Sequence, residues 1–170
     1  QVPTVDHAVM RYYTQRVFQS LLETATTATK ADGGSIMVYD TQRDDLRISA
    51  SQGLSDQVVS ATRLKRGEGL AGLVAQERRI LLLDQQTSDP RLRARMQRPE
   101  VTSSLIAPLS VEASAEPVGV LSLRTSSATQ RFTEDHVSLL HKLLELAGIA
   151  LGSLRLVFHR ESPPPPASSG

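Results

Sequence analysis

Arg66-Gly-Glu-Gly-Leu-Ala-Gly-Leu-Val74, followed by Ile80-Leu-Leu-Leu-Asp84, is the most informative segment of this 170-residue chain. Two glycines bracket a glutamate, a short apolar helix follows, and an apolar strand runs to an aspartate. The spacing also fits a dinucleotide-binding turn, but that turn follows a buried parallel strand, and the residues before this one are mostly basic. We therefore expect a tight turn at Gly67 and close helix-to-sheet packing at Gly72. The alternative is ligand contact through backbone N–H groups at the helix start.

Hydrophobic periodicity divides the chain into helices and strands. Residues 6–29 lack glycine and proline and repeat apolar side chains every three or four positions, which predicts a long helix. A second long helix is expected after Thr133, and short helices at residues 55–60 and 70–76. Strands are expected at residues 35–39, 46–50, 62–65, 80–83, 102–111 and 117–124. This order predicts an α+β domain built around an antiparallel sheet.

Five segments in a fixed order resemble the GAF family of small-molecule sensor domains. They are the glycine motif, the strand ending at Asp84, Ser103-Ser-Leu-Ile-Ala-Pro-Leu109, Val118-Gly-Val-Leu-Ser-Leu123 and Phe132-Thr-Glu-Asp135. The resemblance implies a PAS-related, six-stranded antiparallel sheet with long N- and C-terminal helices on one face. Short helices and loops on the other face often enclose a ligand in that family.

The ends of the chain differ in composition from its middle. We expect residues 1–9 to be an N-terminal extension or helix start, residues 10–158 to be the GAF-like domain, and residues 159–170 to be a linker to a neighbouring domain. The linker follows from Ser162-Pro-Pro-Pro-Pro-Ala-Ser-Ser-Gly170, which favours an extended conformation. No N-terminal segment has a signal-peptide pattern, and charged residues interrupt the apolar window 137–158. We therefore expect a cytoplasmic domain without membrane insertion.

Composition restricts the chemistry that the chain can perform. It has no cysteine, which excludes disulfides, thiolate nucleophiles, iron–sulfur clusters and a bilin attached through cysteine. The free methionine sulfoxide reductases that share the GAF fold need reactive cysteines, so that activity is excluded too. The histidines, His7, His136, His141 and His159, lie in or beside the terminal helices, so we expect no metal or haem site. A net charge of +1 and the absence of tryptophan argue against nucleic-acid binding.

We expect a ligand site between the sheet and residues 67–98, where the glycine turn, an apolar helix and a polar loop meet. The loop, residues 84–99, has room for a helical turn and carries several arginines. These arginines either lie in solvent or bind an anionic group of a ligand or partner. The predicted lining residues are Leu70, Leu73, Val74, Leu83, Arg95, Met96, Arg98 and Leu105, with Arg95 and Arg98 expected to bind a small anionic ligand. No cofactor is expected.

The last helix carries more apolar surface than one sheet needs to cover. One seam steps by three and four residues, and a second seam on the neighbouring face contains Leu139, Leu143, Leu146, Ala150 and Val157. Two seams predict a homodimer interface, unless both are buried within the monomer. The residues expected in the dimer interface are Val137, Leu140, Leu144, Ala147, Leu151 and Leu154.

The resemblance implies a non-catalytic regulatory domain that binds a small molecule, or relays a signal through its terminal helices, to control an adjoining output domain. The sequence offers no convergent nucleophile, acid and base, so no catalytic residue is predicted. The alternative is a ligand-free module for dimerisation or protein–protein contact. A filled core and the absence of ligand-induced stabilisation would favour that alternative.

Overall fold

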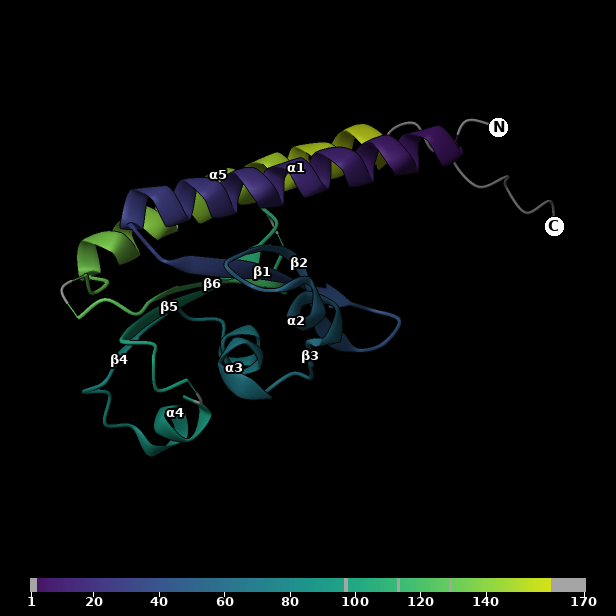
Figure 1. Cartoon of the computed structure of the whole chain (residues 1–170). Coiled ribbons are helices and arrows are strands. Elements are labelled where there is room, and N and C mark those ends of the chain that lie inside the picture. Colours follow the sequence, from purple (N-terminus) through teal and green to yellow (C-terminus); the bar gives the residue numbers. More distant parts are fainter. Residues whose placement is uncertain (1–2, 97, 113, 129, 160–170) are drawn as a thin grey trace.

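The computed structural model describes residues 3–159 except residues 97, 113 and 129. Its six strands form one antiparallel sheet in the order β3-β2-β1-β6-β5-β4 (Figure 1). The strands are β1 Gly33–Asp40, β2 Asp45–Gln52, β3 Arg63–Leu64, β4 Leu81–Asp84, β5 Ser103–Ser110 and β6 Pro117–Thr125. The predicted six-stranded antiparallel fold is confirmed. Beyond His159, the predicted linker lies outside the described residues.

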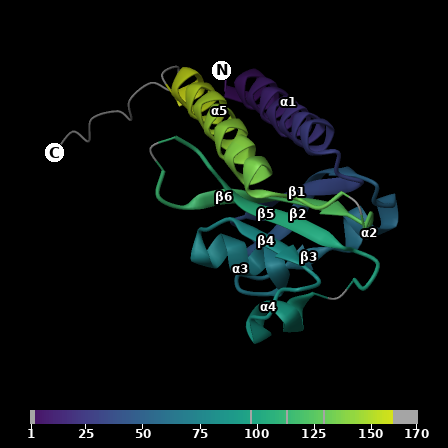
Figure 2. The same cartoon turned by 90° about the vertical axis from the view of Figure 1, so that its left-hand side faces the viewer.

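Two long helices cover one face of the sheet and run antiparallel to each other (Figure 2). These are α1 Pro3–Thr29 and α5 Glu134–His159. Side chains such as Phe18 and Leu22 of α1 and Leu140 of α5 meet the sheet in one core cluster. Burying a leucine or phenylalanine side chain contributes about 1.5–3 kcal/mol relative to leaving it exposed. The predicted placement of both terminal helices on one face is therefore confirmed.

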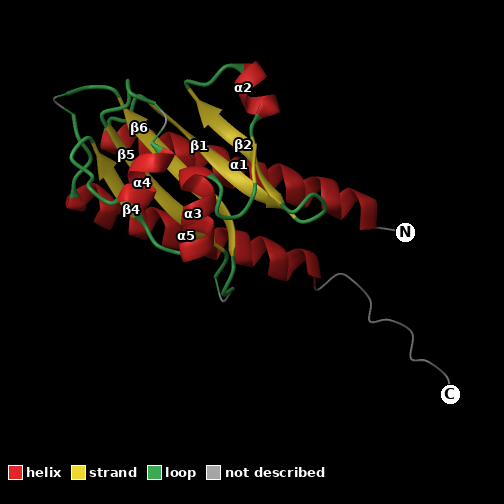
Figure 3. Cartoon of the chain, turned by 90° about the horizontal axis from the view of Figure 1, so that it is seen from below, coloured by secondary structure: helices red, strands yellow, loops and turns green. Residues whose placement is uncertain are grey.

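The opposite face of the sheet carries three short helices and their loops (Figure 3). They are α2 Asp56–Ala61, α3 Gly69–Glu77 and α4 Pro90–Arg95. α3 lies on the sheet and buries Leu73 and Val74 in a second core cluster with Met37 and Ile106. α4 occupies the polar loop where the sequence left room for a helical turn, and Leu92 is its buried side chain.

The glycine motif shapes the turn that leads into α3. Gly67 and Gly69 have φ angles of +81° and +64°, in the left-handed region that favours glycine. The Gly67 N–H donates to the Gly72 carbonyl at 3.0 Å, and a Cβ on Gly72 would lie 2.6 Å from the Lys65 carbonyl oxygen. The predicted tight turn and close helix-to-strand packing are therefore both present.

The two apolar seams of α5 have different surroundings. Leu140, Ala147 and Leu151 are only 0%, 7% and 5% exposed, because they belong to the core cluster with the sheet and α1. For Leu140 and Leu151 the expected place in a dimer interface is therefore wrong, since side chains buried within one chain cannot contact another, whereas Ala147 also lines a groove between α1 and α5. The other predicted interface residues, Val137, Leu144 and Leu154, are half-buried.

The orientation of α5 leaves three residues of its second seam exposed, Leu139, Leu146 and Val157, while Leu143 packs against the core cluster. Gly148 lies against the end of β5, where a Cβ would come within 2.6 Å of the Ser110 carbonyl oxygen. The opposite side presents five exposed apolar residues, which we name the α5 stripe: Leu139, Leu146, Ile149, Leu156 and Val157. Among the described residues, the segment Glu134–Val157 is the one helix long and apolar enough to cross a membrane, which by itself is weak evidence for a span. Only 22% of that segment is buried, so much of its apolar surface is uncovered within one chain.

Candidate functional site

A cavity of about 520 Å³ lies between the sheet and the short helices. Strand residues form its floor, while α2, the start of α3 and the segment around the end of α4 form its walls. The floor contains Ser35, Met37, Ile48, Ser104, Ile106, Ser122 and Arg124. The apolar wall residues are Leu54, Val58, Leu64, Leu70, Ala71, Met96 and Val101. This size, with apolar walls and a few convergent polar groups, is typical of small-molecule sites.

The strand register gives the cavity a polar end and an apolar end. Ser35 of β1 lies opposite Ser122 of β6, and Ser104 of β5 lies opposite Arg124 of β6. Because side chains alternate between the two faces of a sheet, the next residue of β1 on this face is Met37. Hydroxyl and guanidinium groups therefore gather at one end of the floor, and the apolar side chains continue from there.

Half of the predicted lining residues line this cavity: Leu70, Arg95, Met96 and Arg98. Leu73, Val74 and Leu83 instead lie beside it, buried in the core cluster between α3 and the sheet. They support the wall and do not reach the cavity. Ligand contact by the four lining residues stays a prediction.

Leu105 is on the wrong face of the sheet for the predicted role. Its side chain is 0% exposed and belongs to the core cluster beneath the terminal helices. Its neighbours Ser104 and Ile106 line the cavity. A shift of one residue along a strand exchanges the two faces, which is the physical reason for this correction.

Arg124 is the most important lining residue that the sequence patterns did not single out. One nitrogen of its guanidinium group, Nη2, donates to the carbonyl oxygens of Gly53 at 3.0 Å and Gln52 at 3.3 Å. A Cβ on Gly33 would lie 2.5 Å from the same nitrogen, so this glycine provides the space that the guanidinium fills. The signal was present in the sequence: Leu121 and Leu123 face the core, so Ser122 and Arg124 face the other way.

The charge on Arg124 has little local compensation. Burial lowers the pKa of Arg124, and the nearby positive charge of Arg98 lowers it further, against the opposing influence of Asp32 and Glu100. Asp32 is itself engaged, because its carboxylate accepts hydrogen bonds from Ser126 N–H at 2.6 Å and from the Thr125 hydroxyl at 3.3 Å. The cavity therefore contains a partly desolvated cation that an anion would stabilise.

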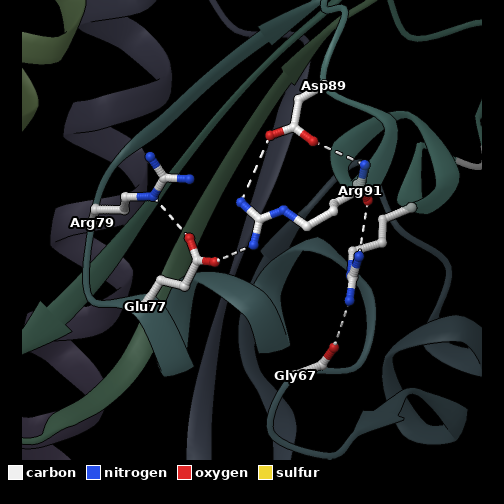
Figure 4. A network of polar contacts seen from close by, with 6 residues as sticks. Gly67, Glu77, Arg79, Asp89 and Arg91 are labelled. Atoms are coloured by element: carbon white, nitrogen blue, oxygen red, sulfur yellow. Dashed lines mark hydrogen bonds and ion pairs between the residues drawn. The ribbon is translucent and has the colours of Figure 1, made fainter.

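A polar network holds α4 beside α3 (Figure 4). The Glu77 carboxylate accepts hydrogen bonds from Arg79 at 2.8 Å and from Arg91 at 2.9 Å, and these bonds lower the pKa of Glu77, that from Arg79 most. Arg95 donates to the carbonyl oxygens of Arg91 at 2.8 Å and Gly67 at 3.4 Å. Arg91 and Arg95 therefore fasten the cavity wall to α3 and the glycine turn, and Arg95 combines this role with its place in the lining.

The cavity lining has little capacity for acid–base or metal chemistry. Its single carboxylate, Glu68, accepts a hydrogen bond from the Lys65 N–H at 2.9 Å. In the part of the chain that the structure describes, no three histidine, aspartate or glutamate side chains gather in a way that could hold a metal ion. The arrangement is suited to binding a small molecule.

A separate groove of about 870 Å³ lies between α1 and α5. It is lined mainly by apolar side chains, including Val17, Leu143, Leu146 and Leu154, and its charged lining residue is Arg16. Leu146 and Val157 of the α5 stripe belong to this lining. The groove has few polar groups to orient a ligand, so its form suits a packed helix better than a small molecule.

An antiparallel sheet with paired terminal helices on one face and a cavity under short helices on the other defines a class of sensor-like domains. The sequence pattern of the GAF domain family matches residues 14–152, and the chain belongs to this family. No protein with a curated description is detectably similar in sequence.

Solved structures agree with this assignment. The GAF domain of an Acinetobacter phosphoenolpyruvate-protein phosphotransferase has a TM-score of 0.66 and 23% identity, over 94% of this chain and 98% of that one. A fragment of a methyl-accepting chemotaxis protein has a TM-score of 0.69 and 19% identity, over 92% and 98% of the two chains. A type II free methionine-R-sulfoxide reductase from Thermoplasma acidophilum has a TM-score of 0.66 and 17% identity, over 85% and 96%. At these identities the likeness shows the fold, which occurs in a chemotaxis protein and also in a reductase.

Proposed function

We propose that this chain is a non-catalytic regulatory domain of a cytoplasmic signalling protein, which binds a small anionic molecule in the sheet cavity. The observation that carries the proposal is a cavity with apolar walls and three arginines in its lining, Arg95, Arg98 and Arg124. Guanidinium groups in a partly buried site favour anions. The lack of cysteine argues against the chemistry of the reductase relatives.

The sheet itself supplies a route from the cavity to the terminal helices. On β6, Ser122 and Arg124 line the cavity, while Leu121 and Leu123, which alternate with them, pack in the core cluster beneath α1 and α5. A ligand that shifts β6 therefore changes the packing of both long helices, because close-packed cores transmit small displacements. We propose that the helices pass this change to an adjoining output domain.

Thermal denaturation in the presence of a panel of metabolites tests ligand binding. A compound at 100 times its Kd should stabilise the domain by about 2.7 kcal/mol. Ser122→Leu, which extends an apolar side chain into the cavity, should abolish the shift while the protein remains folded by circular dichroism. Ser60→Trp, on the exposed side of α2, is the matched control. The absence of any shift that Ser122→Leu removes would contradict the proposal.

We further propose that the domain forms a homodimer through the α5 stripe and the groove between α1 and α5. The stripe is a ridge and the groove a hollow on the same helix pair, so a two-fold axis can place the ridge of one copy in the groove of the other. Exposed Tyr12 and Tyr13 of α1 extend the apolar surface. The product is a four-helix bundle, which covers the α5 surface left open in a single chain.

Sedimentation analysis tests the dimer. The wild-type domain should have twice the 18.5 kDa mass of one chain, and Leu146→Glu should convert it to a folded monomer. Arg43→Glu changes charge at an exposed position of the turn between β1 and β2, away from the stripe and the groove, and should remain dimeric. A wild-type monomer at micromolar concentration, or a Leu146→Glu dimer, would contradict the proposal.

The α1–α5 groove also favours a second candidate function, a GAF domain that serves dimerisation alone. In that case the dimer persists and no compound in the panel stabilises the protein through the cavity. The two experiments together therefore separate a sensor from an assembly module.

A further inference from the structure

We propose that the cavity ligand is an amphipathic monocarboxylate, with its carboxylate on Arg124 and its apolar body along Met37, Ile48 and Ile106. The inference rests on the proposed sensor function and makes Arg124 the residue that determines ligand specificity. Three observations support the inference: the polarity of the cavity floor, the position of Arg124 and the charges around Arg124.

The guanidinium group of Arg124 is pre-organised by contacts within the protein. Two backbone carbonyls accept hydrogen bonds from one of its nitrogens, and the missing side chain of Gly33 leaves room for the guanidinium. Among the described residues, no carboxylate forms an ion pair with it within 4.0 Å. The N–H groups on Nε and Nη1 are not used by these two carbonyls, so they can donate charge-assisted hydrogen bonds to a carboxylate.

Three hydroxyl groups surround the position that a carboxylate on Arg124 would take. Ser104 is opposite Arg124 in the register, and Ser35 is opposite Ser122 one step further along the sheet. Within the described part of the chain, none of these hydroxyls has a hydrogen-bond partner, although Ser35 is only 9% exposed. Hydroxyl groups that line the cavity in this way can donate to a polar group of a ligand.

The apolar part of the floor continues directly from this polar end. Met37 of β1 pairs with Ile48 of β2, and Ile106 of β5 lies opposite Ser122. Leu64 and Leu70 approach from the wall. A ligand with its carboxylate at Arg124 must therefore place an uncharged, apolar body over these residues.

The surrounding charges favour one negative charge on the ligand. Arg98 lies 4.0 Å from its partner Glu100, while Arg95 donates to two backbone carbonyls at the glycine turn and α4. Glu68 lies in the lining, where a second anionic group would meet a like charge.

Isothermal titration calorimetry with defined probes tests this inference. The probes are linear monocarboxylates of roughly five to ten carbons, a range chosen to fit a small-molecule pocket, with their primary amides and inorganic phosphate as comparisons. At least one carboxylate should bind saturably, its amide should bind at least tenfold more weakly, and phosphate should not displace it. Equal binding of the amide, or displacement by phosphate, overturns the inference.

Variants assign the carboxylate contact to Arg124. Arg124→Gln should weaken binding about ten- to hundredfold, since it removes a charged hydrogen-bond partner. Arg93→Gln, whose guanidinium donates to the Gln85 carbonyl outside the cavity, is the matched control and should bind normally. If Arg124→Gln fails to fold, Arg124→Lys and Ser35→Ala, which removes only the hydroxyl, replace it, and each should weaken the carboxylate more than the amide. Unchanged affinity in these folded variants overturns the assignment.

The outcomes also separate this inference from the proposed function. If a neutral or cationic compound binds and Ser122→Leu abolishes its binding, the cavity is a ligand site and the carboxylate inference is wrong. If no probe and no metabolite binds, both proposals are wrong.

Discussion

Gly67 shows how one backbone angle fixes the start of the cavity wall. With φ at +81°, a side chain at this position is strained, and a Cβ would lie 3.0 Å from Gln76 Oε1. Gly67→Val should therefore reduce the free energy of unfolding by about 1–3 kcal/mol. Urea denaturation measures the change.

The matched control is Gly152→Ala in α5. A Cβ there would be 3.5 Å from Glu112 Cβ, an ordinary contact, and the helix favours alanine by about 1 kcal/mol. Gly152→Ala should be neutral or stabilising. If Gly67→Val were equally neutral, the motif would not serve backbone geometry.

At the residue scale, the sequence predicted the position of the cavity better than it predicted which residues line it. The glycine turn and the nearby apolar residues predicted the cavity wall, and four lining residues followed from proximity along the chain. Whether Leu105 and Arg124 line the cavity depends on which face of the sheet each side chain occupies. Strands buried on both faces, such as β5, lack the alternation of polar and apolar residues that would reveal this.

The network around Glu77 gives α4 a pH-dependent attachment. The pKa of Glu77 is lowered in the folded protein, so its interactions stabilise the fold at neutral pH. This stabilisation is lost as the pH falls below the ordinary glutamate pKa of about 4.3 and through the lower folded value. Glu77→Gln should therefore lower the melting temperature at pH 7, with a difference from wild type that shrinks as the pH falls.

Two measurements complete this test. Hydrogen exchange at pH 7 should be faster in α4 of Glu77→Gln, because Arg91 loses its charged partner. Glu23→Gln, an exposed position of α1 outside the network, should leave exchange in α4 unchanged. A difference between wild type and Glu77→Gln that stays constant with pH would contradict the assigned sign.

The two seams of α5 should respond differently to truncation. Leu140→Ala removes a side chain that is 0% exposed and should cost about 2–5 kcal/mol of unfolding free energy. Leu146→Ala removes a side chain that is 64% exposed, and in a monomeric background such as Leu139→Glu it should cost less than about 0.5 kcal/mol. Similar costs at the two positions would mean that the helix is rotated relative to the structure.

At the element scale, the sequence predicted helices and strands well where their periodicity was strong. It did not show which seam of α5 faces the sheet, since both are leucine-rich. That choice depends on tertiary contacts, including the approach of Gly148 to β5. The start of α4 was readable in principle, because Asp89 caps its first turn and Pro90 fits the first helical position.

For the whole molecule, dimerisation should make thermal stability depend on protein concentration. The melting temperature of the wild-type domain should rise with concentration, because association stabilises the folded state. Leu146→Glu should melt at a temperature that does not depend on concentration. Differential scanning calorimetry over a hundredfold range of concentration measures both, and a constant wild-type value would contradict the dimer.

The overall architecture followed from the order of segments, whereas the assembly did not. The hairpins and the terminal helices form from residues that are close together in the sequence, so the order of segments is enough to predict them. The partner of an exposed apolar face is not local, and two of the residues that the sequence assigned to a dimer interface, Leu140 and Leu151, belong to the core.

The antiparallel course of α1 and α5 places the beginning of one beside the end of the other (Figures 1 and 2). Protein chain entering and leaving the domain therefore passes through nearly the same point. Domains with adjacent ends can be inserted into, or removed from, a host sequence without separating the parts on either side. The domain can therefore be moved as a unit from one host protein to another. The rotation of each terminal helix about its axis then has to match that of the host segment that continues it.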